Sequence, residues 1–386
     1  MREYASTLRD GIGCTIPLET AEDPANDMVG GMNYHFTIVF EDNVTWICRT
    51  RRQNISSPPI ELQNAIIESE VSTMQFLFNV GLPVPRVHGY SPHSDTNAVG
   101  RPFILMDMIK GKPLNWYAAD DAAKKHVLRQ LADIFITLSQ HPFEAIGCLY
   151  HSGSSFTIGP MTFDDHATQD ADGTLIPLGP FPDCESYLSA LIERNLQFIL
   201  EGKAYSNARI DAYLVHLALR DYLPAISAFY APSGGKFFLK HMDDKGDHII
   251  VDDAFNIVGI IDWEWAQFVP KSDAFAAPLF LLDVAKYYDG HNQLSAEEIL
   301  FANIFEDKGY SDLADAVRGG RVHHRIAHCI GGDVDNLDDF SKLFLGLRKF
   351  VAHEHPAEDS WVKWKDNALV EYRLDNGLQK LLLDVA

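Results

Sequence analysis

Cysteine is scarce in this chain of 386 residues, and its five cysteines are widely separated. They form no C-x-x-C pair and are odd in number, which argues against zinc-finger spacing and against a disulfide framework. No apolar run approaches the roughly 18 residues that a membrane-spanning helix needs. The first residues also lack the apolar core of a signal peptide. We therefore expect a cytoplasmic protein without a membrane segment.

Basic residues are also few. The chain has 32 Lys and Arg against 54 Asp and Glu, which gives a net charge of −22. A nucleic-acid-binding surface requires the opposite sign, so we expect no nucleic-acid partner. The acidic field has two interpretations: a solvated surface that keeps the protein in solution, or attraction of a cationic partner such as an amine.

Lysine is absent from the first part of the chain, because Lys110 is the first one. Any cation that this part needs for binding phosphate must therefore be an arginine. The sequence also contains no G-x-x-x-x-G-K-[ST] motif, which argues against a P-loop enzyme.

The predicted elements of the first hundred residues form a small sheet with one helix. Alternating apolar residues predict strands over 36–40 and 45–49, joined as a hairpin, and a further strand over 103–106. Apolar residues with helical spacing predict a helix over 60–79.

The rest of the chain is predicted to be mainly helical. Gly111 and Pro113 are interpreted as a hinge, and 151–182 as a Gly- and Ser-rich insertion. The longer predicted helices cover 118–139, 183–200 and 210–230. We therefore predict an α+β fold with two lobes: an antiparallel β-rich lobe with one helix at 1–107, and a larger helical lobe at 108–386.

Two aspartates follow the ends of predicted strands in the second part. Asp243 lies in a polar loop after an apolar run, and Asp262 ends the second strand of a predicted hairpin, 249–251 with 257–261. Such a hairpin brings both carboxylates to one end of a small sheet. One proton-accepting and one metal-holding carboxylate suit phosphoryl transfer. The alternatives are an Asx-turn for Asp243 and a structural salt bridge for Asp262.

This segment resembles the aminoglycoside phosphotransferase and choline kinase family, whose members have a protein-kinase-like fold. The family motif runs His-Gly-Asp, a short loop, Asn, a strand, and Ile-Asp-Trp or Ile-Asp-Phe. It matches His241, Asp243, the strand at 249–252 and Ile261-Asp262-Trp263, and the loop is most similar to a fungal branch that reads Asp-Lys-Gly-Asp-His.

The resemblance implies an enzyme that transfers phosphate from ATP to a hydroxyl group of a small molecule with Mg²⁺. It implies that Asp243 accepts or orients the hydroxyl proton, that His241 braces the loop, and that Asp262 holds the metal. It also implies that the helical lobe and the 151–182 insertion bind the acceptor, which the acidic charge would allow to be cationic.

One position departs from the motif, because the metal-binding Asn of the family falls on His248. Three interpretations follow. His248 holds the loop while Asp247 supplies the second oxygen ligand; or it binds a softer metal, which imidazole prefers to Mg²⁺; or the second metal site is lost and catalysis is weak or absent.

The residues that would bind the nucleotide are predicted from their positions relative to the family's nucleotide-binding segments. Gly30 and Gly31, followed by Asn33, lie where the family has its loop over the nucleotide, and glycines let backbone N–H groups approach phosphate. Arg49 takes the place of the family's phosphate-binding cation, with Arg51 on the same strand face as the substitute.

Two further predictions complete that side. Glu70 lies close to the apolar stripe of the predicted helix and is the expected partner of Arg49, since a carboxylate there needs a counter-charge. Met106 and Met108 fall on the segment whose backbone would hold adenine.

Three functions therefore compete. The first is the ATP- and Mg²⁺-dependent phosphotransferase. The second is a kinase-like protein that binds a nucleotide or a metabolite without turnover. The third is a metal enzyme of another kind that uses His241, Asp243, Asp247 and His248 on a softer ion.

Overall fold

The computed structural model describes residues 1–17, 32–52, 57–94, 97, 99–163, 168–170, 172–230, 234–331, 336–352 and 360–385. Contacts divide the chain into two compact units. The first contains residues 1–137, 147–180 and 241–267, and the second contains 138–146, 181–240 and 268–386. The first unit thus includes the predicted aspartate hairpin, so the division of roles at 107 stays a prediction.

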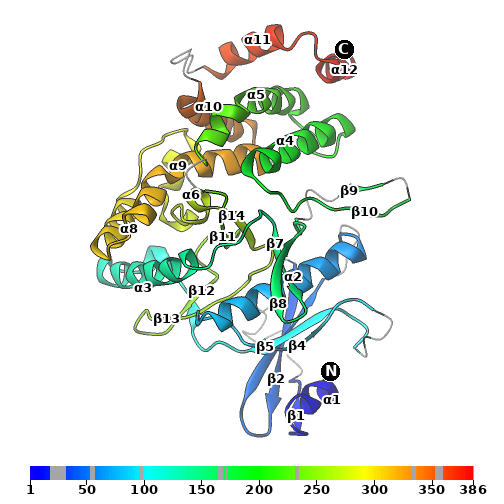
Figure 1. Cartoon of the computed structure of the whole chain (residues 1–386), viewed down its shortest axis with the longest axis vertical. Coiled ribbons are helices and arrows are strands. Elements are labelled where there is room, and N and C mark those ends of the chain that lie inside the picture. Colours follow the sequence, from blue (N-terminus) through cyan, green and yellow to red (C-terminus); the bar gives the residue numbers. More distant parts are fainter. Residues whose placement is uncertain are drawn as a thin grey trace. The chain divides into compact units, whose positions relative to one another are not determined.

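A five-stranded antiparallel sheet forms one end of the first unit (Figure 1). Its spatial order is β1-β2-β3-β5-β4. The strands are β1 (Cys14–Thr15), β2 (Asn33–Phe40), β3 (Thr45–Arg51), β4 (Val87–Ser91) and β5 (Phe103–Asp107), and the short helix α1 (Arg2–Thr7) precedes them. The predicted hairpin is confirmed, with Ile38 opposite Trp46.

One long helix, α2 (Ile60–Asn79), packs against β4 and β5 of this sheet. It has the predicted bounds, because its apolar side chains recur with helical spacing and Pro59 precedes its first turn. The apolar core of the sheet includes Ile38, Trp46 and Leu105. The sequence prediction of an antiparallel β-rich part with one main helix is therefore confirmed.

The predicted aspartate hairpin is also present in the first unit. Strand β12 (Ile249–Val251) pairs antiparallel with β13 (Ile257–Ile260), and the register places Ile249 opposite Ile260. On its other edge, β12 pairs with β6 (Lys112–Pro113), so the segment interpreted as a hinge is a short strand. Local composition does not reveal this pairing, since the partner strand lies far along the chain.

The 151–182 segment differs from the prediction of an insertion without regular structure. It contains two antiparallel pairs, one formed by β7 (Cys148–Ser152) with β8 (Ser155–Gly159), the other by β9 (Thr168–Gln169) with β10 (Leu175–Ile176). Strands of two to five residues are too short to show an alternating pattern. Before them come a 3₁₀ turn (Trp116–Ala118) and α3 (Asp121–Ser139), which begins three residues later than predicted.

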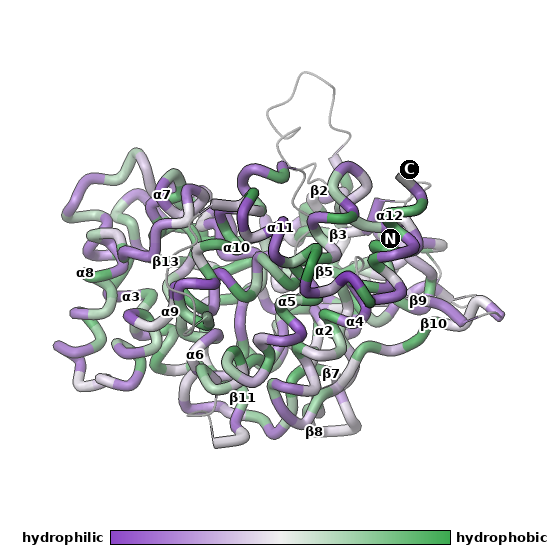
Figure 2. Tube along the Cα trace, turned by 90° about the horizontal axis from the view of Figure 1, so that it is seen from above, coloured by the Kyte–Doolittle hydropathy of each residue, from purple (hydrophilic) through white to green (hydrophobic). Residues whose placement is uncertain are grey.

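The second unit is mainly helical, and in its described part β11 (Phe237–Lys240) pairs with β14 (Gln267–Pro270). Hydrophobic and hydrophilic residues alternate along its helices, as in α8 (Figure 2). The helices are α4 (Cys184–Glu201), α5 (Arg209–Ala228), α6 (Lys271–Ala274), α7 (Val284–Tyr288), α8 (Ala296–Asp307), α9 (Ser311–Gly331), α10 (Leu337–Val351), α11 (Trp361–Glu371) and α12 (Asn376–Val385), with a 3₁₀ turn at Leu279–Leu281. The described helices include none that is long and apolar enough to cross a bilayer.

Candidate active site

Arg49 is the centre of a buried ion cluster in the first unit. Strand β3 carries Arg49 and Arg51 on one face, because side chains two residues apart in a strand point the same way. The Arg49 guanidinium donates a hydrogen bond to the Glu70 carboxyl group of α2, so the predicted contact between the two residues is present. It also donates to Asp262 Oδ1 over 3.2 Å.

Glu264 is the member of this cluster that the sequence did not predict. Its carboxylate accepts hydrogen bonds from Arg49 and from Arg51, and from Asn33 Nδ2 over 2.9 Å. Only 3% of its surface is exposed. The available sequence signal was an acid between two tryptophans, Trp263 and Trp265, where an unpaired carboxylate would be costly.

The surroundings shift the pKa values of Glu70 and Glu264, the two glutamates that contact Arg49, in opposite directions. Burial raises the pKa of Glu70 to about 8, although the nearby Arg49 charge opposes this. For Glu264, burial also acts to raise the pKa, but Arg49, Arg51 and the Asn33 hydrogen bond outweigh it and the pKa is lowered. Glu264 is therefore the carboxylate that stays ionised between the two arginines.

The space enclosed by this cluster is small. A cavity of about 10 Å³ lies among Asn33, Arg49, Arg51, Glu70 and Glu264. That is close to the least volume that holds one water molecule. Both guanidinium groups donate hydrogen bonds to carboxyl groups in this conformation, Arg49 to Glu70 and Glu264 and Arg51 to Glu264.

The loop that carries Asp243 is braced by two stacked histidines. His241 Nε2 lies 3.0 Å from the carbonyl oxygen of Ile261. A carbonyl only accepts, so Nε2 carries the proton. The His241 and His248 rings are stacked with centroids 4.0 Å apart, and the Trp263 ring meets His241 edge-on. His241 thus joins the loop to the end of β13, as the bracing role requires.

Both rings are neutral. Burial lowers the pKa of His241 despite the nearby carboxylates. Burial above all lowers the pKa of His248 to about 2, and the positive charge of Lys245 acts in the same direction. The Nδ1 atoms of both rings are buried and have no hydrogen-bond partner among the described residues. His248 therefore packs behind His241 as an uncharged ring.

Three carboxylates lie near both His241 and Lys245. The charges of Asp243, Asp247 and Asp262 all act to raise the pKa of His241 and that of Lys245. Lys245 Nζ lies 2.9 Å from Asp243 Oδ1. The side chains of Asp243 and Asp262 are 35% and 51% exposed, so their oxygens are accessible. The hairpin thus brings the two predicted acids to one neighbourhood.

The backbone at Asp262 is strained. Its φ is +63°, a left-handed conformation that only glycine adopts freely and that Asn and Asp tolerate better than other residues. Trp265 also has a left-handed φ of +65°. The turn after β13 is fixed by a hydrogen bond of 3.0 Å from Trp263 Nε1 to the Ile260 carbonyl. Strain that is held in this way often marks a functional segment.

The remaining predicted residues are placed as follows. Gly30 and Gly31 lie outside the described residues. Met106 is in β5, between Ile47 of β3 and Val87 of β4. Met108 follows the strand with an exposed side chain. No three of the described His, Cys, Asp and Glu residues form a cluster that could hold a metal ion.

The comparisons with known proteins concern this segment and the sheet before it. A model described as the phosphotransferase enzyme family matches residues 38–270. No curated protein sequence matches the chain significantly.

Several solved structures are similar. One is a candidate aminoglycoside phosphotransferase from Ralstonia eutropha, with 13% identity, 98% of this chain and 96% of that chain covered, and a TM-score of 0.50. An ethanolamine kinase from Plasmodium vivax shares 13% identity, with 98% and 88% covered and a TM-score of 0.48. A thermostable mutant of the aminoglycoside phosphotransferase APH(4)-Ia, in complex with AMP-PNP and hygromycin B, shares 13% identity, with 92% and 99% covered and a TM-score of 0.47. At 13% identity, the likeness to the Ralstonia eutropha protein concerns the fold alone.

Proposed function

This chain belongs to the phosphotransferase enzyme family, and from that membership we propose that it transfers the terminal phosphoryl group of ATP to a hydroxyl group of a small molecule. One observation carries the proposal. Asp243 lies in the loop that His241 Nε2 joins to the Ile261 carbonyl over 3.0 Å, and Ile261 is the neighbour of Asp262 after β13. Two accessible carboxylates in one neighbourhood suit the two roles that phosphoryl transfer needs.

Asp243 is the residue that orients the acceptor. Its carboxylate is partly exposed, and its loop is held by His241 through the Ile261 carbonyl. From that position it accepts a hydrogen bond from the acceptor hydroxyl and takes its proton as the new oxygen–phosphorus bond forms. His241 is a positioning residue, since its Nε2 proton is used by the backbone.

The donor set fits a hard divalent cation. Asp262 and Asp247 offer carboxylate oxygens, which Mg²⁺ prefers and which it usually supplements with water and substrate phosphates. Bound there, Mg²⁺ would neutralise charge on the phosphate oxygens. His248 is neutral and packed against His241, so we propose that it holds the loop rather than the metal.

Arg49 has two proposed roles. Through its bond to Asp262 it fixes the metal-holding carboxylate, and it supplies the cation that this lysine-free part of the chain needs for phosphate. The second role requires that Arg49 be released in part from Glu264, because the enclosed space holds about 10 Å³. Gly30, Gly31, Asn33, Met106 and Met108 remain proposed contacts to the nucleotide.

The acceptor is proposed to be a hydroxylated small molecule, and the net charge of −22 favours one that carries an amine. Aromatic rings in the C-terminal helices could bind such a cation through their faces. Trp364 is unsuited to that role, because it is buried against Phe344 and Trp361 and belongs to the core.

A second function has its own support. Lys245 bonds to Asp243, and a neutral His248 stands where the family motif has Asn. A protein with these features can bind nucleotide without turning it over.

The deciding experiment measures ADP release from ATP with Mg²⁺ across a panel of hydroxylated compounds. We expect at least one acceptor to support turnover, and Asp243→Asn to lower kcat by about 10²–10⁴-fold. Asp253→Asn, in the exposed turn of the same hairpin, is the matched control and should keep full activity. Thermal stabilisation by ATP and Mg²⁺ without ADP release for any acceptor would favour the second function.

A further inference from the structure

A hollow of about 330 Å³ lies at the end of α2 in the first unit. It is lined by residues from the last turns of α2, from the start of β4 and from β7, namely Gln75, Phe78, Asn79, Arg86, Val87 and His151. The volume lies in the range of small-molecule sites. None of these residues belongs to the Arg49 cluster or to the Asp243 loop, so the proposed phosphoryl transfer does not use the hollow.

The described lining carries the Arg86 cation and no Asp or Glu. Arg86 is exposed, and no carboxylate of the described residues pairs with its guanidinium group, which lies 5.9 Å from the centre of the Phe78 ring. Its backbone is fixed, because its carbonyl accepts a hydrogen bond of 3.0 Å from the Asp107 amide. In a chain with a net charge of −22, an accessible arginine without an acidic partner offers a binding point for an anion.

Two amide side chains add neutral donors beside Arg86. His151 Nε2 lies 2.6 Å from Gln75 Oε1. An amide oxygen only accepts, so Nε2 carries the proton, and this hydrogen bond orients the Gln75 amide. The NH₂ groups of Gln75 and Asn79 donate to no acceptor among the described residues. Three side chains with N–H groups are therefore available to the oxygens of an anion.

The C-terminal end of α2 would disfavour an anion if its carbonyl groups were free, because a helix carries negative partial charge at that end. The carbonyl groups of residues 76–78 are bonded, however. They accept hydrogen bonds of 3.0 and 3.1 Å from the backbone amides of residues 80–82 in the turn that follows the helix. The positive charge of Arg86 is therefore not needed to cap the helix.

The apolar part of the lining favours an organic anion over an inorganic one. The side chain of Phe78 is 47% exposed, and Val87 lies beside it in the lining. A flat aromatic body would cover the Phe78 ring, and a flat ring also stacks on a guanidinium plane. Phosphate or acetate would leave the Phe78 ring in water.

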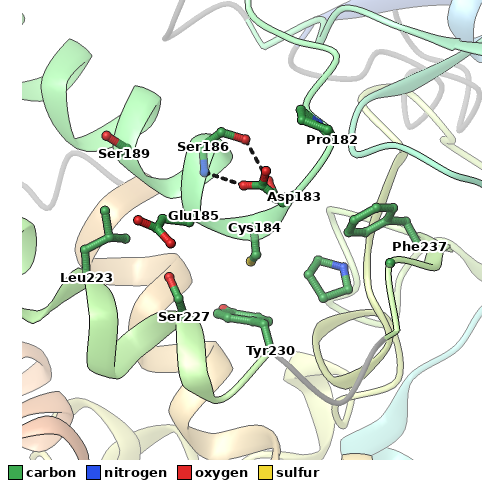
Figure 3. Close-up of a pocket in the computed structure, with 12 residues that line it drawn as sticks. Pro182, Asp183, Cys184, Glu185, Ser186, Ser189, Leu223, Ser227, Tyr230 and Phe237 are labelled. Atoms are coloured by element: carbon green, nitrogen blue, oxygen red, sulfur yellow. Dashed lines mark hydrogen bonds between the residues drawn. The ribbon is translucent and has the colours of Figure 1, made fainter.

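The pocket drawn in Figure 3 has the opposite charge. It belongs to the second unit, and its described lining contains Asp183 and Glu185 and no Lys, Arg or His. An organic anion would meet like charges there. The guanidinium groups of Arg49 and Arg51 already donate to carboxyl groups. The hollow beside Arg86 is therefore better suited to an organic anion than either of these two places.

We propose that the hollow beside Arg86 binds a small aromatic carboxylate. The carboxylate oxygens accept hydrogen bonds from Arg86 and from the amide groups of Gln75 and Asn79, while the aromatic ring covers Phe78. This site goes beyond the proposed function, because it requires neither ATP nor the residues of phosphoryl transfer.

The test is fluorine NMR at pH 7 with 4-fluorobenzoate and 4-fluorobenzamide, which have nearly the same shape and differ in charge. We expect 4-fluorobenzoate to bind with a Kd of about 1 mM or tighter, and the amide to bind about tenfold more weakly. Arg86→Gln should weaken 4-fluorobenzoate binding by about tenfold or more, since a hydrogen bond between charged groups is lost. Arg101→Gln removes an exposed cation outside the hollow and is the matched control, which should bind as the original chain does.

A further variant tests the role of the aromatic wall. Phe78→Ala removes the exposed ring and should weaken 4-fluorobenzoate binding by about two- to tenfold. Thermal melts establish that each variant is folded. The proposal is overturned if 4-fluorobenzoate does not bind, if the amide binds equally well, if folded Arg86→Gln or Phe78→Ala binds 4-fluorobenzoate normally, or if Arg101→Gln weakens binding as much as Arg86→Gln does.

Discussion

Arg49 and Glu264 form a buried ion pair that joins β3 to the segment just after Asp262. The two residues are 215 positions apart in the sequence, and 4% and 3% of their surfaces are exposed. Because Arg49 also donates to Asp262, this pair helps to fix the carboxylate that is proposed to hold the metal.

The two glutamates on Arg49 are expected to differ in their contribution to stability. Glu264→Gln leaves two buried arginines short of a counter-charge and should lower the free energy of unfolding by about 3–5 kcal/mol. Glu70→Gln should cost clearly less near neutral pH, because burial already raises the pKa of Glu70 to about 8 and favours its neutral form. Urea denaturation of both variants at pH 7 measures the difference, and equal losses would contradict the assignment of charge.

His248 is expected to make the protein sensitive to acid. Its pKa falls from 6.5 to about 2 on folding, so between these values the unfolded chain binds a proton that the folded chain does not. The stability from this group is complete above pH 6.5 and is lost as the pH falls toward 2. The slope reaches about 1.4 kcal/mol per pH unit for this single group.

The matching variant is His248→Asn, which removes that contribution. The free energy of unfolding of the original chain should fall more steeply between pH 6.5 and 4.5 than that of the variant. Burial also lowers the pKa of His323, to about 4. His323 therefore also makes the free energy of unfolding fall as the pH falls, and it does so in both proteins. Identical slopes would show that His248 does not stay neutral in the folded chain.

Lys245 is expected to compete with a divalent cation. Its hydrogen bond to Asp243, and then the charges of Asp243, Asp247 and Asp262, raise its pKa. Lys245→Ala removes a positive charge from the carboxylates and should tighten Mn²⁺ binding by roughly fivefold, an order of magnitude set by Coulomb attraction near a surface. Electron paramagnetic resonance measures the free Mn²⁺ and so gives the affinity.

Lys112→Ala is the control, because Lys112 pairs with Asp253 at an exposed position, and its Mn²⁺ affinity should not change. Unchanged Mn²⁺ affinity in Lys245→Ala would argue against a metal site at Asp243, Asp247 and Asp262.

Two substitutions at Asp262 can distinguish the effect of its backbone conformation from the effect of its charge. Asp262→Asn and Asp262→Ala both remove the carboxylate, so both should abolish phosphoryl transfer. Asn tolerates the left-handed φ of +63°, whereas Ala should lose about 1 kcal/mol more stability. Thermal melts of the two variants compare the cost, and equal stability would mean that the strain is relieved when the carboxylate is lost.

Much of the fold follows from local sequence patterns. The 60–79 helix and the hairpin of β2 and β3 have strong periodicity, and the structure confirms both. The family that the sequence resembles is confirmed by the match over residues 38–270. The strands β6, β7 and β8 do not follow from the sequence, because two to five residues form a strand only when a partner is adjacent.

In the candidate site, too, some features follow from the sequence and others only from the tertiary structure. The sequence itself pointed to Asp243, Asp262 and His241 through the family resemblance, and the lack of a lysine before Lys110 indicated an arginine as the cation. It also suggested Glu70 as the partner of Arg49, because helical spacing placed that acid beside an apolar stripe. Only the tertiary structure decided that Glu264 shares Arg49 and Arg51, and that His248 is a neutral ring behind His241. Ion pairing and burial depend on which distant segments meet, and the amino-acid order alone does not state those distances.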